Sequence, residues 1–262
     1  MVFQQFCQVF MVWTLSTLFL PVSWASSINY LIYGTSAEPL QIVEQEGRYS
    51  GFITDVVNEV FAGSGVTVNP LLKPIGRHKV AMINGQAERW IAYALNSWRK
   101  ETVWQDATFA DVELLSYTLS LGYKDLGIWP PPTPAVDVNT LAEKGVVWIR
   151  GFKYPGTGQF SKAYGFEFQR AKNHVSMLNM VEADRVRYFM EHAPRMKYVM
   201  KKQGVDVAEY DFFSLADFVP PTSITLLMSN DLGEEVITLV NRRLQEMADS
   251  GRLRVLAKPY GL

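Results

Sequence analysis

The sequence predicts an α/β fold made of two similar halves, and three observations support this. Short apolar runs alternate with segments of helical periodicity, which is typical of a doubly wound parallel sheet covered by helices. Residues 90–95 (WIAYAL) are apolar on both faces, as expected of an interior strand. Three consecutive prolines at 130–132 then divide the chain, and a second α/β pattern begins after them. We therefore expect two lobes of similar build.

The first half is expected to hold helices and strands in alternation before the chain crosses over. Asp55 can cap a helix within 51–65, whose apolar residues share one helical face. A second helix is expected at 77–84, where Gly85 follows. The expected strands are 29–34, 66–70 with Pro70 as its end, 90–95 and 114–122.

The second half repeats the pattern, and the C-terminus carries the clearest helix. The expected strands are 145–151 and 185–190, and the expected helices are 177–183 and 194–203. Near the C-terminus, Asp231 and Glu234 have the spacing of a capping box. The amphipathic helix that follows should end at Gly251, and its apolar stripe indicates core packing.

The composition permits a large core and argues against one class of partner. The chain has 262 residues, of which 48% are hydrophobic, and 25 Lys plus Arg stand against 26 Asp plus Glu. Because no cluster of basic residues rises above this background, we expect no nucleic-acid partner.

Residues 1–25 have the features of an export signal. Residues 9–20 carry no charge, Pro21 interrupts the run, and Ser23 and Ala25 are small residues where a signal peptidase cleaves. The run is shorter than the roughly 20 residues of a membrane span. We expect cleavage after Ala25 and a periplasmic mature chain. Because no Lys or Arg precedes the apolar run, an uncleaved anchor is the alternative.

The few cysteine and histidine residues exclude several kinds of chemistry. Cys7 is the one cysteine of the sequence and lies within the signal segment, so the mature chain would have no thiol. Disulfides, thiolate metal sites and cysteine nucleophiles are then excluded. The three histidines (His78, His174 and His192) lack metal-ligand spacing. We expect neither a metal nor another cofactor.

Four segments, in order, resemble the bacterial extracellular solute-binding protein family 3, the periplasmic polar amino-acid-binding proteins of ABC transporters. They are Tyr33-Gly34-Thr35 with 51–55 (GFITD), 85–99, 185–189 (RVRYF) and 241–261. The resemblance implies a two-lobed type II periplasmic-binding-protein fold, each lobe a doubly wound mixed sheet flanked by helices. It further implies that 26–116 plus 216–262 form lobe 1 and 117–215 form lobe 2. The hinge would consist of two segments near 117–121 and 214–218, and ligand would favour the closed form.

In lobe 1 the resemblance implies a ligand site around Arg99. A guanidinium binds a carboxylate with two parallel hydrogen bonds, so Arg99 is the expected anchor, although it also fits an exposed surface cluster. The family's backbone-contacting glycine falls on Ala92 and its ligand-binding threonine on Ala94, which lacks the hydroxyl. Asn96 can bond to ligand nearby or form the turn. Glu38 stands where the family has an aromatic residue that stacks on the ligand.

In lobe 2 the expected ligand residues follow two strands. Gly151 and Phe152 stand where the family has Gly-Thr before a helix, and Phe152 can supply an apolar wall. Glu191 and His192 stand near the aspartate that binds the ligand's amino group in most members. Because side chains alternate along a strand, we expect only one of these two to face the cleft. Glu191 could replace the family's carboxylate, and His192 could bind an anionic group or make the site sensitive to pH. The alternative is that the pair lies at a solvated strand end.

Three functions follow from this reading. The first is a monomeric binding protein that captures a small, carboxylate-bearing, amino-acid-like ligand for an ABC-type membrane permease. The second is a ligand sensor or adaptor for a membrane signalling receptor. The third is a dehydratase-like enzyme that uses Glu191, His192 or Glu38, against which stands the absence of a compact catalytic motif. We expect a binding protein and no enzyme.

Overall fold

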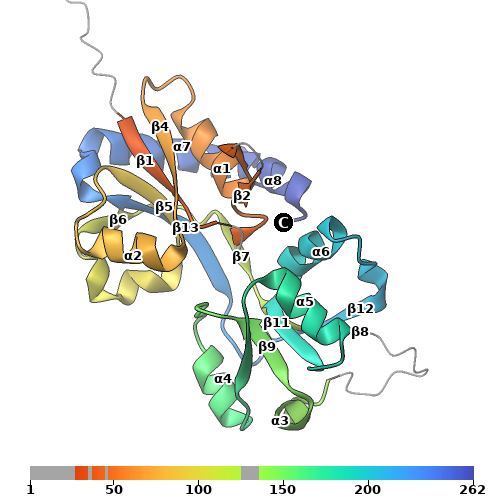
Figure 1. Cartoon of the computed structure of the whole chain (residues 1–262). Coiled ribbons are helices and arrows are strands. Elements are labelled where there is room, and N and C mark those ends of the chain that lie inside the picture. Colours follow the sequence, from red (N-terminus) through yellow and green to blue (C-terminus); the bar gives the residue numbers. More distant parts are fainter. Residues whose placement is uncertain (1–26, 35–36, 45–46, 125–135) are drawn as a thin grey trace, which may run out of the picture.

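The computed structural model describes residues 27–34, 37–44, 47–124 and 136–262, which two sheets organise (Figure 1). The expected signal peptide with Cys7 and the proline cluster at 130–132 lie outside these residues. Within the described ranges, no helix has both the length and the apolar character needed to cross a membrane.

The first sheet is built from both ends of the described chain. Its order is β4-β1-β5-β13-β6, with β7 also paired to β13. The strands are β1 (Ser27–Ile32), β4 (Thr67–Leu72), β5 (Trp90–Leu95), β6 (Ala107–Phe109), β7 (Leu115–Tyr117) and β13 (Thr222–Ser229). β1 runs parallel to β4 and β5, whereas β13 is antiparallel to β5, β6 and β7. A late segment of the chain thus completes an early sheet. We call this sheet and its helices the first lobe.

Helices α1 (Phe52–Phe61), α2 (Ile75–Ile83), α7 (Glu234–Asp249) and α8 (Arg252–Ala257) belong to the first lobe, with a short hairpin of β2 (Ile42–Val43) and β3 (Tyr49–Ser50). α1 buries its apolar face and begins after Gly51, whose φ is 110°. A Cβ at Gly51 would lie 2.7 Å from the carbonyl oxygen of Leu40, so only glycine fits there.

Three local predictions for the first lobe were wrong. Asp55 does not cap α1; its carboxylate accepts a hydrogen bond from the Tyr260 hydroxyl at 2.6 Å. Asp231 does not cap α7, which starts after Gly233; it accepts instead from the backbone N–H of Arg89 at 2.9 Å. Pro70 does not end its strand, because β4 is an edge strand in which the missing N–H costs little.

The second sheet has the order β10-β9-β11-β8-β12. Its strands are β8 (Leu119–Lys124), β9 (Val146–Ile149), β10 (Phe168–Ala171), β11 (Tyr188–His192) and β12 (Tyr210–Ser214). β9 runs parallel to β10 and β11, and β8 is antiparallel to β11 and β12. Both sheets are therefore mixed and not wholly parallel. The helices are α3 (Leu141–Lys144), α4 (Thr157–Ala163), α5 (His174–Glu182) and α6 (Ala193–Lys202), and this sheet with its helices is the second lobe.

Two strand connections link the lobes (Figure 1). The single strand expected at 114–122 is two strands, because β7 ends at Tyr117 in the first sheet and β8 begins at Leu119 in the second. The return path leaves β12 at Ser214 and enters β13 at Thr222. The proposed lobe boundaries at 116/117 and 215/216 stay predictions. Among the residues that the structure describes, no strand belongs to both sheets.

Candidate functional site

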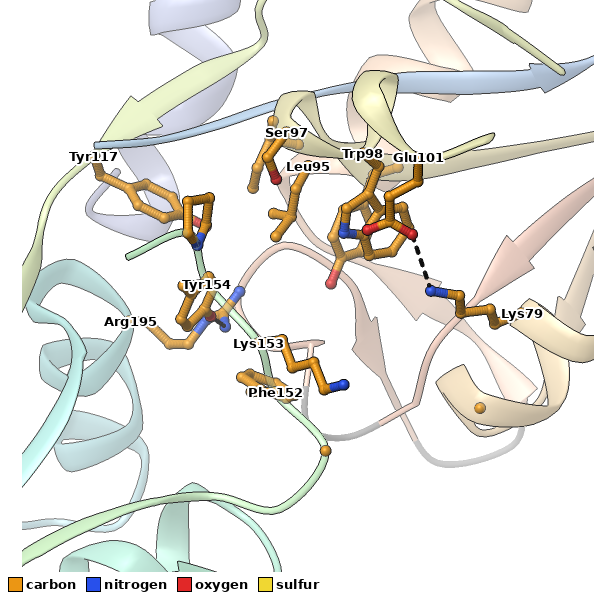
Figure 2. Close-up of a pocket in the computed structure, with 15 residues that line it drawn as sticks. Lys79, Leu95, Ser97, Trp98, Glu101, Tyr117, Phe152, Lys153, Tyr154 and Arg195 are labelled. Atoms are coloured by element: carbon orange, nitrogen blue, oxygen red, sulfur yellow. Dashed lines mark hydrogen bonds and ion pairs between the residues drawn. The ribbon is translucent and has the colours of Figure 1, made fainter. Parts of the chain in front are cut away.

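A pocket of about 430 Å³ lies where the two lobes face each other (Figure 2). Its size is within the range of small-molecule sites. The first lobe and Tyr117, on the crossing strand, provide Gly76, Lys79, Tyr93, Leu95, Ser97, Trp98, Glu101, Tyr117 and Ile224. The second lobe provides Gly151, Phe152, Lys153, Tyr154, Pro155 and Arg195. Aromatic and aliphatic side chains form most of this wall.

Strand β5 supplies one wall through its alternation of faces. Tyr93 and Leu95 line the pocket, while Ala92 and Ala94 are fully buried on the other side of the strand. The short helix η3 (Asn96–Lys100) follows β5 directly and carries Trp98 into the pocket wall.

The rim of the first lobe is an aromatic and charged cluster. Trp98 stacks on Trp104 with ring centroids 5.5 Å apart. The Lys79 ammonium lies 5.5 Å from each of these rings and 3.4 Å from the Glu101 carboxylate. Glu101, the one carboxylate in the pocket lining, is therefore already paired with a cation.

The second lobe contributes a buried cation. Helix α6 starts at the end of β11, and Arg195 lies in its first turn, only 3% exposed although it reaches the pocket. Its Nη1 donates to the Tyr154 hydroxyl at 3.2 Å and lies 3.7 Å from Oε2 of Glu191. A guanidinium has five N–H donors, so Arg195 keeps donors for a ligand.

Glu191 lies behind this wall and balances part of the positive charge. Its Oε2 is 2.9 Å from Nε2 of His174, and its Oε1 accepts from the backbone N–H of His192 at 2.9 Å and from Tyr154 at 3.3 Å. Burial alone would raise the pKa of the Glu191 carboxyl. The Arg195 charge and the His174 hydrogen bond outweigh burial and hold this pKa well below its usual range. An ionised carboxylate only accepts, so Nε2 of His174 carries the proton.

His192 is a neutral side chain at the lobe crossing. Burial lowers its pKa to about 3, although the nearby Glu191 charge opposes the shift. Nδ1 of His192 lies 3.3 Å from the carbonyl oxygen of Thr118, and its ring centroid is 3.5 Å from that of Tyr117. His192 thus packs β11 against the first crossing segment and does not titrate near neutral pH.

The charges on the pocket lining favour an anion. Three lining side chains are cationic (Lys79, Lys153 and Arg195) and one, Glu101, is anionic. Even with the buried Glu191 included, one positive charge remains. Arg195 is only 3% exposed, and an opposite charge is held more strongly in such a poorly hydrated place than at the surface.

Two of the nine sequence-predicted site residues, Gly151 and Phe152, line the pocket. Arg99 does not: its guanidinium donates to the side-chain oxygen of Asn96 and to the carbonyl oxygen of Ala110, and it lies 4.9 Å from the Phe109 ring. A ligand role for Arg99 stays a prediction.

The remaining predicted residues lie outside the pocket lining. Asn96 donates to Glu113 at 2.7 Å. Glu38 accepts from the Lys202 ammonium at 2.8 Å, and this ion pair joins the two lobes. For Glu191 and His192, the alternative of a solvated strand end was wrong, because both are at most 1% exposed. Neither side chain lines the pocket, and a ligand role for either stays a prediction.

Sequence reasoning missed Arg195 and three tyrosines. Tyr93 lies between the two predicted alanines and faces the pocket, and a ligand role for Ala92 and Ala94 stays a prediction. Tyr117 was assigned to the hinge and Tyr154 to no role. Arg195 follows Pro194 at an expected helix start, but the sequence carries no signal that this first turn faces the cleft.

Many solved structures are similar to this chain, among them the following three. An ABC uptake transporter substrate-binding protein from Streptococcus pneumoniae with bound histidine has a TM-score of 0.67 and 14% identity over 91% of this chain and 93% of its own. A protein of glutathione import via GshT and the cystine ABC importer TcyBC of Streptococcus mutans has a TM-score of 0.68 and 15% identity, over 90% of this chain and 95% of its own. The VFT2 domain of Bordetella pertussis BvgS has a TM-score of 0.67 and 14% identity, over 90% of this chain and 92% of its own. The chain has the two-lobed type II periplasmic-binding-protein fold.

This fold confirms the resemblance that the four sequence segments indicated, at the level of architecture. No protein-family model matches the chain, and no curated protein matches its sequence. In a type II binding-protein fold the cleft between the lobes is the place where both can contact one ligand. The pocket around Arg195 occupies that place.

Within the described ranges, no group of three or more His, Cys, Asp or Glu side chains is arranged to hold a metal ion.

Proposed function

We propose that this chain is a periplasmic solute-binding protein that captures a small carboxylate-bearing ligand between its lobes for an ABC-type permease. The observation that carries the proposal is Arg195, a cation 3% exposed at a pocket whose lining has three positive side chains and one negative. A carboxylate at Arg195 would receive two parallel hydrogen bonds in a site of low dielectric constant.

Closure of the lobes would follow from contacts on both sides of the ligand. Arg195, Phe152 and Tyr154 belong to the second lobe, and Tyr93 and Trp98 belong to the first. A ligand that contacts both groups binds the closed form more tightly than the open form, so it shifts the population towards closure. The proposal further includes export of the chain by the signal peptide of residues 1–25 and a monomeric state.

The test is a binding measurement with matched arginine variants. Thermal unfolding is recorded with a panel of amino acids, aliphatic and aromatic carboxylates and the corresponding amines, and calorimetry gives Kd for each compound that raises Tm. We expect only compounds that carry a carboxylate to bind. Arg195→Met should weaken their binding roughly ten- to a hundredfold. Arg242→Met, on the exposed side of α7 beside Glu246, is the control and should leave Kd unchanged.

Two further variants make the result decisive. Arg195→Met leaves Glu191 without its cation, so Glu191→Gln/Arg195→Met removes both charges and separates loss of binding from loss of folding. Arg99→Met tests the residue that the family resemblance favoured. If Arg99→Met abolishes binding and the Arg195 variants do not, the pocket assignment fails. If no carboxylate in the panel binds, the proposed function fails.

A second candidate function is ligand sensing for a membrane signalling protein. The BvgS VFT2 domain has the same fold with a TM-score of 0.67, equal to that of the histidine-bound transport protein. The cleft chemistry is the same in both cases, and only the partner differs. Cross-linking in intact cells, followed by mass spectrometry of the captured membrane protein, distinguishes a permease from a signalling receptor.

Binding without turnover agrees with the position of the acidic groups. Glu191 lies behind the wall with its oxygens occupied, and the low pKa of its carboxyl, set by Arg195 and His174 against the effect of burial, makes it a poor proton donor at neutral pH. His192 is neutral and 1% exposed. Product analysis after prolonged incubation with each bound carboxylate should show the compound unchanged.

A further inference from the structure

The surroundings of Arg195 bear on which carboxylates the pocket accepts. An α-amino acid carries its ammonium group on the carbon next to its carboxylate. When Arg195 binds the carboxylate, the ammonium must therefore lie among the groups closest to Arg195. A favourable site there would need a free carboxylate or several carbonyl oxygens.

The carboxylate beside Arg195 is not free. Both oxygens of Glu191 accept hydrogen bonds within the second lobe, from His174, Tyr154 and the backbone of His192, and its side chain is 0% exposed. Recruiting Glu191 for a ligand would break this buried network. An ammonium group would also stand beside the Arg195 charge, which repels it.

The one carboxylate on the lining lies elsewhere. Glu101 is on the opposite side of the pocket from Arg195, and its oxygen is 3.4 Å from the Lys79 ammonium (Figure 2). An ammonium on the α-carbon of a ligand held by Arg195 is directed to the tyrosines and not to Glu101. The pocket thus provides a cation for the carboxylate and no matching anion for the amine.

The groups that do surround Arg195 are neutral phenols. Burial raises the pKa of Tyr93, Tyr117 and Tyr154, and the Arg195 charge only partly offsets this effect. Their hydroxyl groups therefore stay protonated at neutral pH. A neutral phenol can donate one hydrogen bond to a carboxylate. The Tyr154 hydroxyl already donates to Glu191, so Tyr93 and Tyr117 are the phenols on the lining that can add to an anion site.

The rest of the pocket suits a flat apolar body. Five of the fifteen lining residues are aromatic, namely Tyr93, Trp98, Tyr117, Phe152 and Tyr154. Trp98 and Phe152 lie on opposite lobes, with Trp98 held in place by its stack on Trp104. Aromatic rings pack on one another in edge-to-face or offset arrangements that add to the gain from burial.

We infer that, given the proposed function, the ligands of this pocket are aromatic carboxylates that lack an α-ammonium group. The carboxylate binds Arg195 among the three phenols, and the ring packs between Trp98 and Phe152. The inference concerns the class of ligand and therefore deepens the proposal that the cleft captures a carboxylate.

Calorimetry with four matched compounds tests the inference. They are 3-phenylpropionate, L-phenylalanine, 2-phenylethylamine and 3-cyclohexylpropionate, which vary the amine, the carboxylate and the ring one at a time. We expect 3-phenylpropionate to bind at least tenfold more tightly than L-phenylalanine, and 2-phenylethylamine not to bind. The saturated ring should bind more weakly than the aromatic ring.

A variant of the wall tests the ring contact separately. Trp98→Leu should weaken 3-phenylpropionate roughly two- to tenfold, with a smaller effect on 3-cyclohexylpropionate. Equal effects on the two compounds would overturn the aromatic part of the inference.

The remaining outcomes separate the inference from the proposed function. If L-phenylalanine binds as tightly as 3-phenylpropionate, or if only aliphatic carboxylates or amino acids of the wider panel bind, the inference fails and carboxylate capture stands. If 2-phenylethylamine binds as tightly as 3-phenylpropionate, or if no carboxylate binds, both fail.

Discussion

Replacing Arg195 by methionine probes the charge balance on which the site depends. Arg195 and Glu191 are 3% and 0% exposed, and Nη1 of the arginine lies 3.7 Å from Oε2 of the glutamate. Removing one partner of a buried pair leaves an uncompensated charge, which costs about 3–5 kcal/mol of unfolding free energy. His174 and Tyr154 still bond to Glu191 in the variant, so we expect the lower end of that range.

The same substitution should reverse the pH dependence that Glu191 imposes on stability. In the native chain the folded-state pKa of Glu191 lies below the ordinary value of 4.5, since Arg195 and His174 outweigh burial. Its stabilising contribution is present above pH 4.5 and is lost as pH falls through the folded-state pKa. Without Arg195, burial dominates and raises the pKa above 4.5. The variant should then lose stability as pH rises from 4.5 through the raised value.

Urea unfolding at pH 5 and pH 7 measures both effects in a double-mutant cycle. The cycle contains the native chain, Arg195→Met, Glu191→Gln and the double variant. We expect a coupling energy of about 2 kcal/mol or more at pH 7, and the double variant to be more stable than Arg195→Met. Additivity of the single substitutions within about 0.5 kcal/mol, with an unchanged pH dependence, would refute the electrostatic account.

Three further substitutions test packing, hydrogen bonding and lobe contact. Gly122→Ala should lower the unfolding free energy by about 1–3 kcal/mol, because a Cβ there would lie 2.0 Å from the Phe189 ring; thermal unfolding measures this. Tyr154→Phe keeps the ring but removes the hydroxyl between Glu191 and Arg195, and urea unfolding should show a loss of about 1–3 kcal/mol. Lys202→Met removes the ion pair that joins the lobes. Small-angle X-ray scattering of ligand-free protein should then show a larger radius of gyration. The free energy lost with this ion pair is below about 1 kcal/mol, because the lysine side chain is 47% exposed.

Each of these substitutions has a matched control. Gly158→Ala adds a Cβ within helix α4, where nothing lies within 4 Å, and should stabilise the protein; a loss like that of Gly122→Ala would contradict the packing argument. Tyr164→Phe removes a hydroxyl that has no hydrogen bond within the described ranges. If it lowers the unfolding free energy as much as Tyr154→Phe does, the hydrogen bonds of Tyr154 have no special role. Arg242→Met breaks an ion pair within α7, and a matching change in scattering would remove the lobe-closing role of Lys202.

The architecture could be read from the sequence because its signals are local and repeated. Residues 90–95 are apolar on both faces, and β5 spans these residues. The end of β4 was misjudged because the rule against proline within strands holds for interior strands, and pairing order cannot be read from composition. The crossing near Tyr117 was predicted as a hinge, but the break at Thr118 depends on which sheet each strand joins.

The site was harder to predict because it depends on side-chain direction. A shift of one residue along β5 exchanges Ala92 and Ala94 for Tyr93 and Leu95 in the pocket wall. An arginine near the end of a buried strand was a reasonable anchor, yet the short helix η3 turns Arg99 towards Ala110. Arg195 was not recognised as a buried residue. Its charge can be buried because Glu191 lies beside it, and this pairing arises only in the folded state.

The most direct measurement is a crystal structure of the protein with 3-phenylpropionate bound. We expect the carboxylate oxygens to lie within hydrogen-bonding distance of the Arg195 guanidinium, with the ring between the two lobes. A ligand whose carboxylate instead contacts Arg99, or which lies outside the cleft, would contradict it.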